Sequence, residues 1–286
     1  MLRRIFTAEH RKSKALAIRL LALDLDGTIL DAHMQFSPRV RRALRLAEEA
    51  GVHVTLASGR FFPSMRVFAA DLGIHEPLIC LQGAVVQDPI SGRVHFHCGV
   101  PLALAYEFID LVRARGWDLA LYQGDLLCAE RMTLLLEFYA GYSPVREEVH
   151  VVPDLRAFLD SDPLKLVVVA EPEQAAVADA QLRERFAGRL HVVRSFCKFV
   201  EATNLAVSKG QALAFLAQKL GVAQSETMAI GDNDNDADMV AWAGLGVAVG
   251  NASPKVMQAA RYVAAPMEQD GAAEAIERFI LAEQHG

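Results

Sequence analysis

The N-terminal part of the chain alternates between short, largely apolar runs and segments with helical spacing. The apolar runs are Leu20–Leu25, Val52–Ala57 and Leu78–Leu81, and the helical segments between them are Pro38–Ala50 and Phe61–Leu72. Apolar runs of this length suit strands that are buried on both faces of a parallel sheet. The pattern therefore predicts the order β-α-β-α-β, which is typical of a doubly wound α/β sheet.

Capping residues mark the ends of these predicted helices. Ser37 precedes Pro38, a good N-cap followed by proline at the first helical position. Gly51 and Gly73 follow the two apolar-periodic segments and predict their C-terminal ends.

The same order of elements returns near the C-terminus. The predicted helices there are Ser208–Leu220, Asp234–Ala243 and Gly271–Ala282, and the predicted strands are Thr227–Ile230, Gly246–Val249 and Arg261–Ala264. Both ends of the chain are therefore expected to build one α/β core domain from residues 20–87 and 193–286, preceded by an extension of residues 1–19.

The middle of the chain has a different pattern. Strand-like segments there are Val94–His97, Leu119–Tyr122, Leu126–Ala129 and Leu164–Ala170, and helix-like segments are Pro101–Arg115, Met132–Tyr142 and Glu173–Phe186. We interpret residues 88–192 as an α+β cap domain inserted into a Rossmann-like, doubly wound parallel sheet. The length of 286 residues agrees with two domains, since one domain typically takes ~100–150.

Composition narrows the class of protein. The net charge of −6 does not indicate a nucleic-acid-binding face, and no apolar run approaches the ~20 residues of a membrane span. The four cysteines form no C-x-x-C pair, which favours buried thiols in a reducing compartment and hence a cytoplasmic protein. Residues 1–19 are basic but lack the apolar stretch of a secretory signal.

Four clusters of polar residues lie near the carboxyl ends of predicted core strands. The first is DLDGT at residues 24–28. Asp24 and Asp26 alternate on a strand, so both carboxylates are expected on one face, where they repel each other unless a cation lies between them. Hard oxygen ligands suit Mg²⁺. Asp24 is then a candidate nucleophile toward phosphorus, and Asp26 a candidate acid and base.

Two further clusters offer groups for an anion. Ser58 and Gly59 end a strand before a helix, where a hydroxyl and backbone N–H groups form an anion cradle; simple helix capping is the alternative. Arg60 either binds phosphate or pairs with an acid. Lys209 lies at a predicted helix N-terminus, where a cation is unfavourable with the helix dipole and is expected to have an acidic or phosphate partner.

The fourth cluster, GDNDNDAD at residues 231–238, holds four acids in seven positions. An EF-hand loop counted from Asp232 would need glycine and glutamate where Ala237 and Ala243 stand, so that alternative fails. Asp232 is the better Mg²⁺ ligand, and Asp236 acts directly or through a neighbour. Asn235 donates to phosphate or orients a neighbouring group.

These four clusters, in this order and with a large insertion between the second and third, resemble the haloacid dehalogenase superfamily of phosphohydrolases. The insertion resembles a type IIB cap, and the chain looks most similar to Cof-type sugar-phosphatase-like members. The resemblance implies that Asp24 is the nucleophile, that Asp26 is the acid and base, and that Mg²⁺ is held by Asp24, Asp26 through its carbonyl, and Asp232, with Asp236 nearby.

The resemblance also implies that Ser58 and Lys209 hold the phosphate, and Thr28, Gly59 and Asn235 are further candidate phosphate-binding residues. The chain departs from the family at Gln82-Gly83-Ala84, where relatives usually carry Asn-Gly-Ala. This departure is expected to alter a polar contact to the substrate or to the cap hinge, and Gln82 is not assigned to catalysis. The sequence therefore predicts an Mg²⁺-dependent phosphatase that hydrolyses a small phosphorylated metabolite through a phospho-aspartate. A phosphomutase and a non-catalytic phospho-ligand binder are the alternatives. No cap motif selects among sugar phosphates, nucleotides, flavin mononucleotide and pyridoxal phosphate, and none specifies the oligomeric state.

Overall fold

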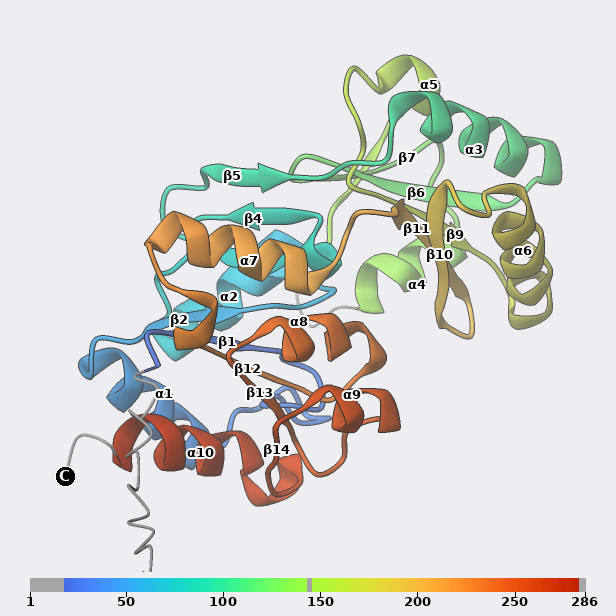
Figure 1. Cartoon of the computed structure of the whole chain (residues 1–286). Helices are drawn as coiled ribbons and strands as arrows, with labels where there is room; N and C mark the ends of the chain where they lie inside the picture. The colour runs from blue at the N-terminus through green and yellow to red at the C-terminus, as the bar shows by residue number, and fades with distance from the viewer. Residues whose placement is uncertain (1–17, 143–145, 283–286) are drawn as a thin grey trace, which may run out of the picture.

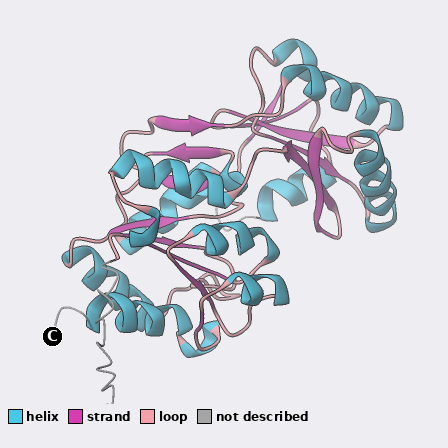
Figure 2. Cartoon of the chain, viewed as in Figure 1, coloured by secondary structure: helices cyan, strands magenta, loops and turns pink. Residues whose placement is uncertain are grey.

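The computed structural model describes residues 18–142 and 146–282, and these residues form three β-sheets with helices packed on them (Figure 1). In this view the core sheet lies at the lower left, the sheet with β4 and β5 lies above it, and the third sheet lies at the upper right. Figure 2 distinguishes the strands from the helices that cover them.

The core sheet is entirely parallel, with the strand order β14-β13-β12-β1-β2. Its strands are β1 (Leu20–Leu23), β2 (His53–Leu56), β12 (Thr227–Gly231), β13 (Leu245–Ala248) and β14 (Tyr262–Val263). Segments from near the two ends of the chain thus pair directly, because β1 lies between β2 and β12. This arrangement confirms the predicted doubly wound parallel sheet.

Helices cover both faces of this sheet. They are α1 (Pro38–Glu49), α2 (Phe62–Leu72), α7 (Lys209–Leu220), α8 (Ala237–Trp242), α9 (Pro254–Ala259) and α10 (Gly271–Ile276). Alternate residues of β1 face opposite layers: Leu21 packs in the cluster that includes α1 and α10, whereas Leu20 packs with Leu213 of α7. Both faces of the strand are buried, which is why its sequence is continuously apolar.

The predicted helix ends agree closely with the structure. The side chain of Ser37 accepts a hydrogen bond from the backbone of Val40 at 3.1 Å, and Pro38 begins α1. Gly73 ends α2 in the left-handed conformation. The predicted C-terminal helix is α10 followed by a π-helical turn over Glu277–Leu281.

A small antiparallel sheet extends the core. It consists of β3 (Leu78–Cys80), β4 (Val85–Gln87) and β5 (Val94–His97), in that order. We expected Val94–His97 in the cap, but β5 pairs with β4, a strand that the sequence reasoning missed. The chain enters the inserted domain only after β5.

The third sheet belongs to the inserted domain and has the order β10-β11-β9-β6-β7-β8. Its strands are β6 (Asp118–Gln123), β7 (Leu126–Ala129), β8 (Val149–Val151), β9 (Lys165–Val169), β10 (Leu190–Phe196) and β11 (Phe199–Asn204). The helices of this domain are α3 (Leu102–Arg115), α4 (Leu134–Tyr142), α5 (Leu155–Phe158) and α6 (Pro172–Arg185). All its pairings are antiparallel except β7 with β8.

The two faces of this sheet pack against different partners. Leu166 of β9 lies in a cluster with α3 and α6, whereas Val167 lies in the cluster that continues into the core domain. Tyr122 of β6 and Phe61 of the core are in ring contact, with centroids 4.6 Å apart. The inserted domain therefore turns its inner face toward the core.

The hairpin β10–β11 lies at the predicted end of the cap. The expected boundary between residues 192 and 193 falls inside β10, and β11 pairs with β9 in the cap sheet. We propose that the inserted domain runs instead between Gly99 and Asn204. The side chain of Asn204 donates to the carbonyl of Gly99 at 2.8 Å, so the two connections lie side by side.

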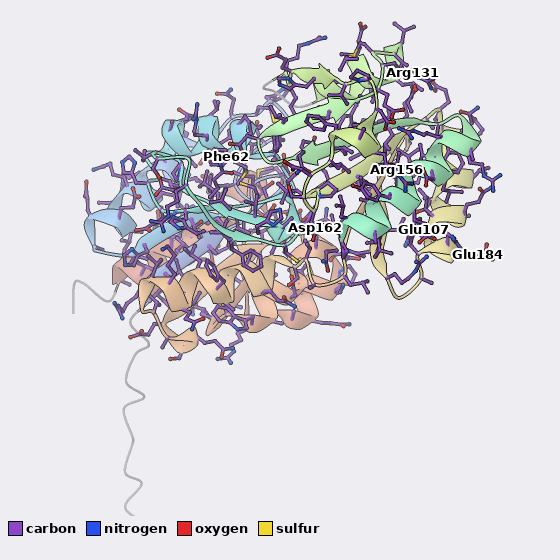
Figure 3. All side chains as sticks on the ribbon, turned by 90° about the horizontal axis from the view of Figure 1, so that it is seen from above. Phe62, Glu107, Arg131, Arg156, Asp162 and Glu184 are labelled. Atoms are coloured by element: carbon purple, nitrogen blue, oxygen red, sulfur yellow. The ribbon has the colours of Figure 1, made fainter. Side chains whose placement is uncertain are left out.

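Asp162 reinforces this junction, because its carboxylate accepts from the backbone of Leu102 at 2.8 Å. Figure 3 places Asp162 between Phe62 on the core and Glu107 on the inserted domain. The predicted extension of residues 1–19 lies outside the described residues up to position 17. Within the described ranges, no helix has both the length and the apolarity that crossing a membrane requires.

Candidate active site

The polar clusters predicted from the sequence meet at one edge of the core sheet. Asp24 follows β1, Ser58 follows β2, and Asp232 follows β12. Because these strands are parallel neighbours, their carboxyl ends lie together, and the backbone N–H of Asp24 donates to Ile230 at 3.0 Å. This is the edge at which open α/β sheets bind their ligands.

Three carboxylates form the centre of the site. Asp24, Asp232 and Asp236 each place one oxygen so that all three oxygens lie within 4.8 Å of one another. Asp24 and Asp236 are almost fully buried, with 5 % and 0 % of their surface exposed. Hard oxygen donors in this number suit a divalent cation such as Mg²⁺.

The electrostatics of these acids suit a divalent cation. Burial raises the pKa of Asp24 well above its ordinary value, although Lys209 opposes the shift. Burial also raises the pKa of Asp232 to about 6, against the hydrogen bond from Thr28. Crowded carboxylates resist ionisation, and a bound cation would remove that cost, so the donor set fits a metal ion.

Lys209 is buried among these acids. Its Nζ lies 2.6 Å from Asp24 Oδ1 and 2.6 Å from Asp236 Oδ1. Burial favours the neutral amine, but Asp236 and Asp24 together raise the pKa of Lys209 above its ordinary value. The predicted acidic partner of this helix-start lysine is therefore a pair of acids, and Ser208 caps the same helix.

Asp236 holds the loop that carries Asp232. Its Oδ2 accepts from the backbone N–H groups of Asp232 and Asn233, at 3.0 and 2.9 Å. With its Oδ1 on Lys209, both oxygens of Asp236 are engaged. Asp236 thus links the lysine, the loop and the carboxylate cluster.

Gly27 and Thr28 lie against Asp232. The Thr28 hydroxyl donates to Asp232 Oδ1 at 2.9 Å. Gly27 has φ +81°, and a Cβ at this position would lie 2.5 Å from Asp232 Oδ2. Only glycine lets the turn after β1 approach this closely. In this structure Thr28, predicted at the phosphate, is engaged with the carboxylate of Asp232.

Asp26 lies apart from the buried cluster. Its side chain is half exposed and forms a two-pronged ion pair with Arg60, with distances of 2.5 Å from Nη2 and 2.8 Å from Nε. The Arg60 guanidinium also lies over the ring of Phe68, 5.3 Å from its centroid. Of the two roles left open for Arg60, pairing with an acid is the one seen here.

Ser58, Gly59 and Asn235 border the space beside Asp24. This pocket of about 170 Å³ is lined by Asp24, Asp26, Ser58, Gly59, Arg60, Gln82, Asn233 and Asn235. Ser58 Oγ accepts from the backbone N–H of Arg60 at 3.2 Å, in the turn before α2, whose N-cap is Phe61. Asn235 Nδ2 donates to Gln82 Oε1 at 2.7 Å. From the sequence, position 82 is expected to affect a polar contact to the substrate or to the cap hinge, without a catalytic role.

A larger cleft of about 1080 Å³ opens next to this pocket, between the core and the hairpin β10–β11. Gln82, Asn233 and Asn235 line both spaces. The cap contributes His191, Val193, Arg194, Ser195, Glu201 and Thr203 to its wall. The sequence reasoning missed this wall, and the available signal was the alternation of polar and apolar residues along β10 and β11.

Known proteins match almost the whole chain. The model of the haloacid dehalogenase-like hydrolase family matches residues 21–276. A putative phosphatase of Bacillus subtilis, YxeH, is 31 % identical over 279 residues, which cover 92 % of this chain and 99 % of the relative.

Two other comparisons extend this finding. The 5-amino-6-(5-phospho-D-ribitylamino)uracil phosphatase YcsE of Bacillus subtilis is 29 % identical over 92 % of this chain and 96 % of the relative. The crystal structure of TM0651 from Thermotoga maritima superimposes with a TM-score of 0.83 at 30 % identity, covering 91 % of this chain and 97 % of that one.

Proposed function

The chain belongs to the haloacid dehalogenase-like hydrolase family, as a phosphoric monoester hydrolase, and we propose that it works with Mg²⁺ through a phospho-aspartate on Asp24. The observation that carries the proposal is the position of Asp24. Its carboxylate lies within 4.8 Å of those of Asp232 and Asp236, 2.6 Å from Lys209, and at the wall of the small pocket.

Asp24, Asp232 and Asp236 would hold the cation. When bound, Mg²⁺ neutralises the negative charge of the phosphoryl oxygens. Lys209 contributes a second positive charge from the protein itself, and its two ion pairs fix its position before a substrate arrives. Preorganised charge of this kind accounts for much of the rate enhancement in many enzymes.

The side chains of the site divide the reaction between them. An oxygen of Asp24 attacks phosphorus, the bond to the ester oxygen breaks, and protonated Asp26 gives its proton to the leaving alkoxide. Asp26, now ionised, takes a proton from water as that water attacks the phospho-aspartate. The bond between Asp24 and phosphorus breaks, which releases orthophosphate and regenerates both acids. Asp26 has to leave Arg60 to act, and its half-exposed position allows this.

We expect orthophosphate release from a panel of small phosphate esters to require Mg²⁺. Treatment with EDTA should lower the rate on the order of 100-fold or more, and added Mg²⁺ should restore it, because the three acids repel one another without a cation. The measurement is colorimetric phosphate release, with product analysis on hexose phosphates. Full activity in EDTA would contradict the metal requirement, and an isomerised ester without free phosphate would indicate a phosphomutase.

The cleft favours a small hydroxylated metabolite as the organic part of the substrate. Glu201 lines the cleft from β11, and the buried Lys165 lies 3.3 Å from its carboxylate. A carboxylate paired with a lysine in this way accepts hydrogen bonds from hydroxyl groups. The relative YcsE is named for a substrate with a ribityl chain, which is of this chemical class.

Replacing Glu201 with glutamine should change the selectivity of the enzyme. We expect KM to rise roughly fivefold or more for hydroxylated esters such as sugar phosphates, because a charge-assisted hydrogen bond is lost. The KM for p-nitrophenyl phosphate, which carries no hydroxyl group, should change less than twofold. Glu184→Gln, an exposed position on the outer helix α6 (Figure 3), is the matched control. Equal changes for both kinds of ester would contradict the role of Glu201.

A further inference from the structure

The turn Leu81–Gly83, which follows β3, contacts the loop after β2 and the start of α7. The backbone N–H of Gln82 donates to the carbonyl of Ser58 at 3.0 Å. Gly83 has φ +98°, and a Cβ there would lie 2.3 Å from the carbonyl of Ser208. The turn is therefore held in place against the loop after β2, which carries Ser58, and against the start of α7, which carries Lys209.

The backbone of this turn is in an unfavourable conformation. Gln82 has φ 63° and ψ 19°, and Leu81 also has a positive φ, of 50°. Residues other than glycine seldom adopt this left-handed region, and asparagine does so more readily than glutamine. Such conformations persist where the surrounding structure requires them, and they cluster at functional sites. We therefore expect the glutamine side chain at this position to make a contact that the structure or the function requires.

The surroundings of the two polar atoms of the Gln82 amide indicate what this contact is. Its Oε1 accepts from Asn235 Nδ2 at 2.7 Å. Its Nε2 lies over Gly59, where an added Cβ would come within 2.4 Å of it. Within residues 18–142 and 146–282, Nε2 makes no hydrogen bond, whereas Gly59 and Asn235 both line the pocket beside Asp24. Gln82 thus presents an unused donor at the junction of the pocket and the cleft.

Building on the proposed phosphatase function, we propose that Gln82 is a further substrate-binding residue, whose Nε2 donates a hydrogen bond to the phosphoryl group while its Oε1 holds Asn235. The cations Lys209 and Arg60 are already paired with carboxylates. A neutral amide adds a donor to the anion without disturbing those ion pairs, and hydrogen bonds to a charged acceptor are among the stronger ones.

The test measures the binding of inorganic phosphate in the presence of Mg²⁺ by calorimetry, together with KM and kcat for p-nitrophenyl phosphate. Gln82→Met keeps the length of the side chain and removes both amide functions. We expect its Kd for phosphate and its KM to rise about tenfold or more, the change expected for one lost hydrogen bond to a charged group. Gln218→Met, at an exposed position of α7, is the matched control and should bind phosphate like the wild type.

Two further variants separate ligand binding from a structural role. Gln82→Glu keeps an acceptor for Asn235 but replaces the donor with a negative charge, so phosphate binding should weaken more than in Gln82→Met. Gln82→Gly relieves the left-handed backbone, so Tm should not fall although phosphate binding weakens.

Unchanged phosphate binding in Gln82→Met would overturn the proposal, as would a wild-type protein that binds no phosphate. Loss of kcat and Tm together, with Kd unchanged, would assign Gln82 a structural role and would also overturn it. A wild type that binds phosphate but hydrolyses no ester would contradict the proposed function, and the comparison of Kd values would still decide the role of Gln82.

Discussion

Replacing Asp24 with asparagine should lower kcat for p-nitrophenyl phosphate on the order of 10⁴-fold or more, because an amide oxygen does not form the phospho-aspartate. The fold should survive the change. In the wild type Lys209 Nζ lies 2.6 Å from Asp24 Oδ1, and asparagine keeps an oxygen that can accept this hydrogen bond. Asp236 still neutralises the lysine. The measurement is steady-state phosphate release at saturating ester and Mg²⁺.

Asp179→Asn is the matched control for this variant. Asp179 pairs with Arg183 on the outer helix α6 of the inserted domain, away from the carboxylate cluster of the core. The activity of Asp179→Asn should therefore equal that of the wild type. Chemical trapping should detect an acid-stable but hydroxylamine-sensitive phosphoryl-protein in the wild type and none in Asp24→Asn. Activity within tenfold of the wild type in Asp24→Asn would remove this residue from the nucleophile's role.

Replacing Lys209 with methionine should reduce both activity and stability. The side chain is 1 % exposed and neutralises Asp24 and Asp236, so its loss leaves buried carboxylates without a counter-charge. Breaking a buried ion pair from one side typically costs about 3–5 kcal/mol. For a chain of this size we expect a fall in Tm of roughly 10 °C. The loss of a preorganised charge on the phosphoryl group should lower kcat on the order of 10³-fold.

Thermal melts with and without Mg²⁺ provide a second measurement on this variant. A bound cation supplies part of the missing positive charge, so Mg²⁺ should raise the Tm of Lys209→Met more than that of the wild type. Lys219→Met, at the exposed end of the same helix, is the control and should melt like the wild type. An unchanged Tm in Lys209→Met would show that the buried carboxylates are neutral without the lysine.

The elements of the core were predictable because their signals are local. The apolar run before Asp24 and the Ser37-Pro38 cap each lie within a few residues of the element they define, and β1 and α1 form there. The hairpin β10–β11 gave a weaker signal. Arg194 and Glu201, which line the cleft, interrupt its apolar pattern, and the boundary predicted between residues 192 and 193 falls inside this hairpin.

The sequence by itself determined the α/β class, the order of the polar clusters and the acids at positions 24 and 232, since periodicity and motif spacing are properties of short segments. The tertiary structure alone decided which groups pair: Lys209 with two acids, Arg60 with Asp26, Thr28 with Asp232 and Gln82 with Asn235. Those choices depend on distances of a few ångströms between segments far apart in the chain. Such distances result from the packing of the whole sheet edge, which no local pattern encodes.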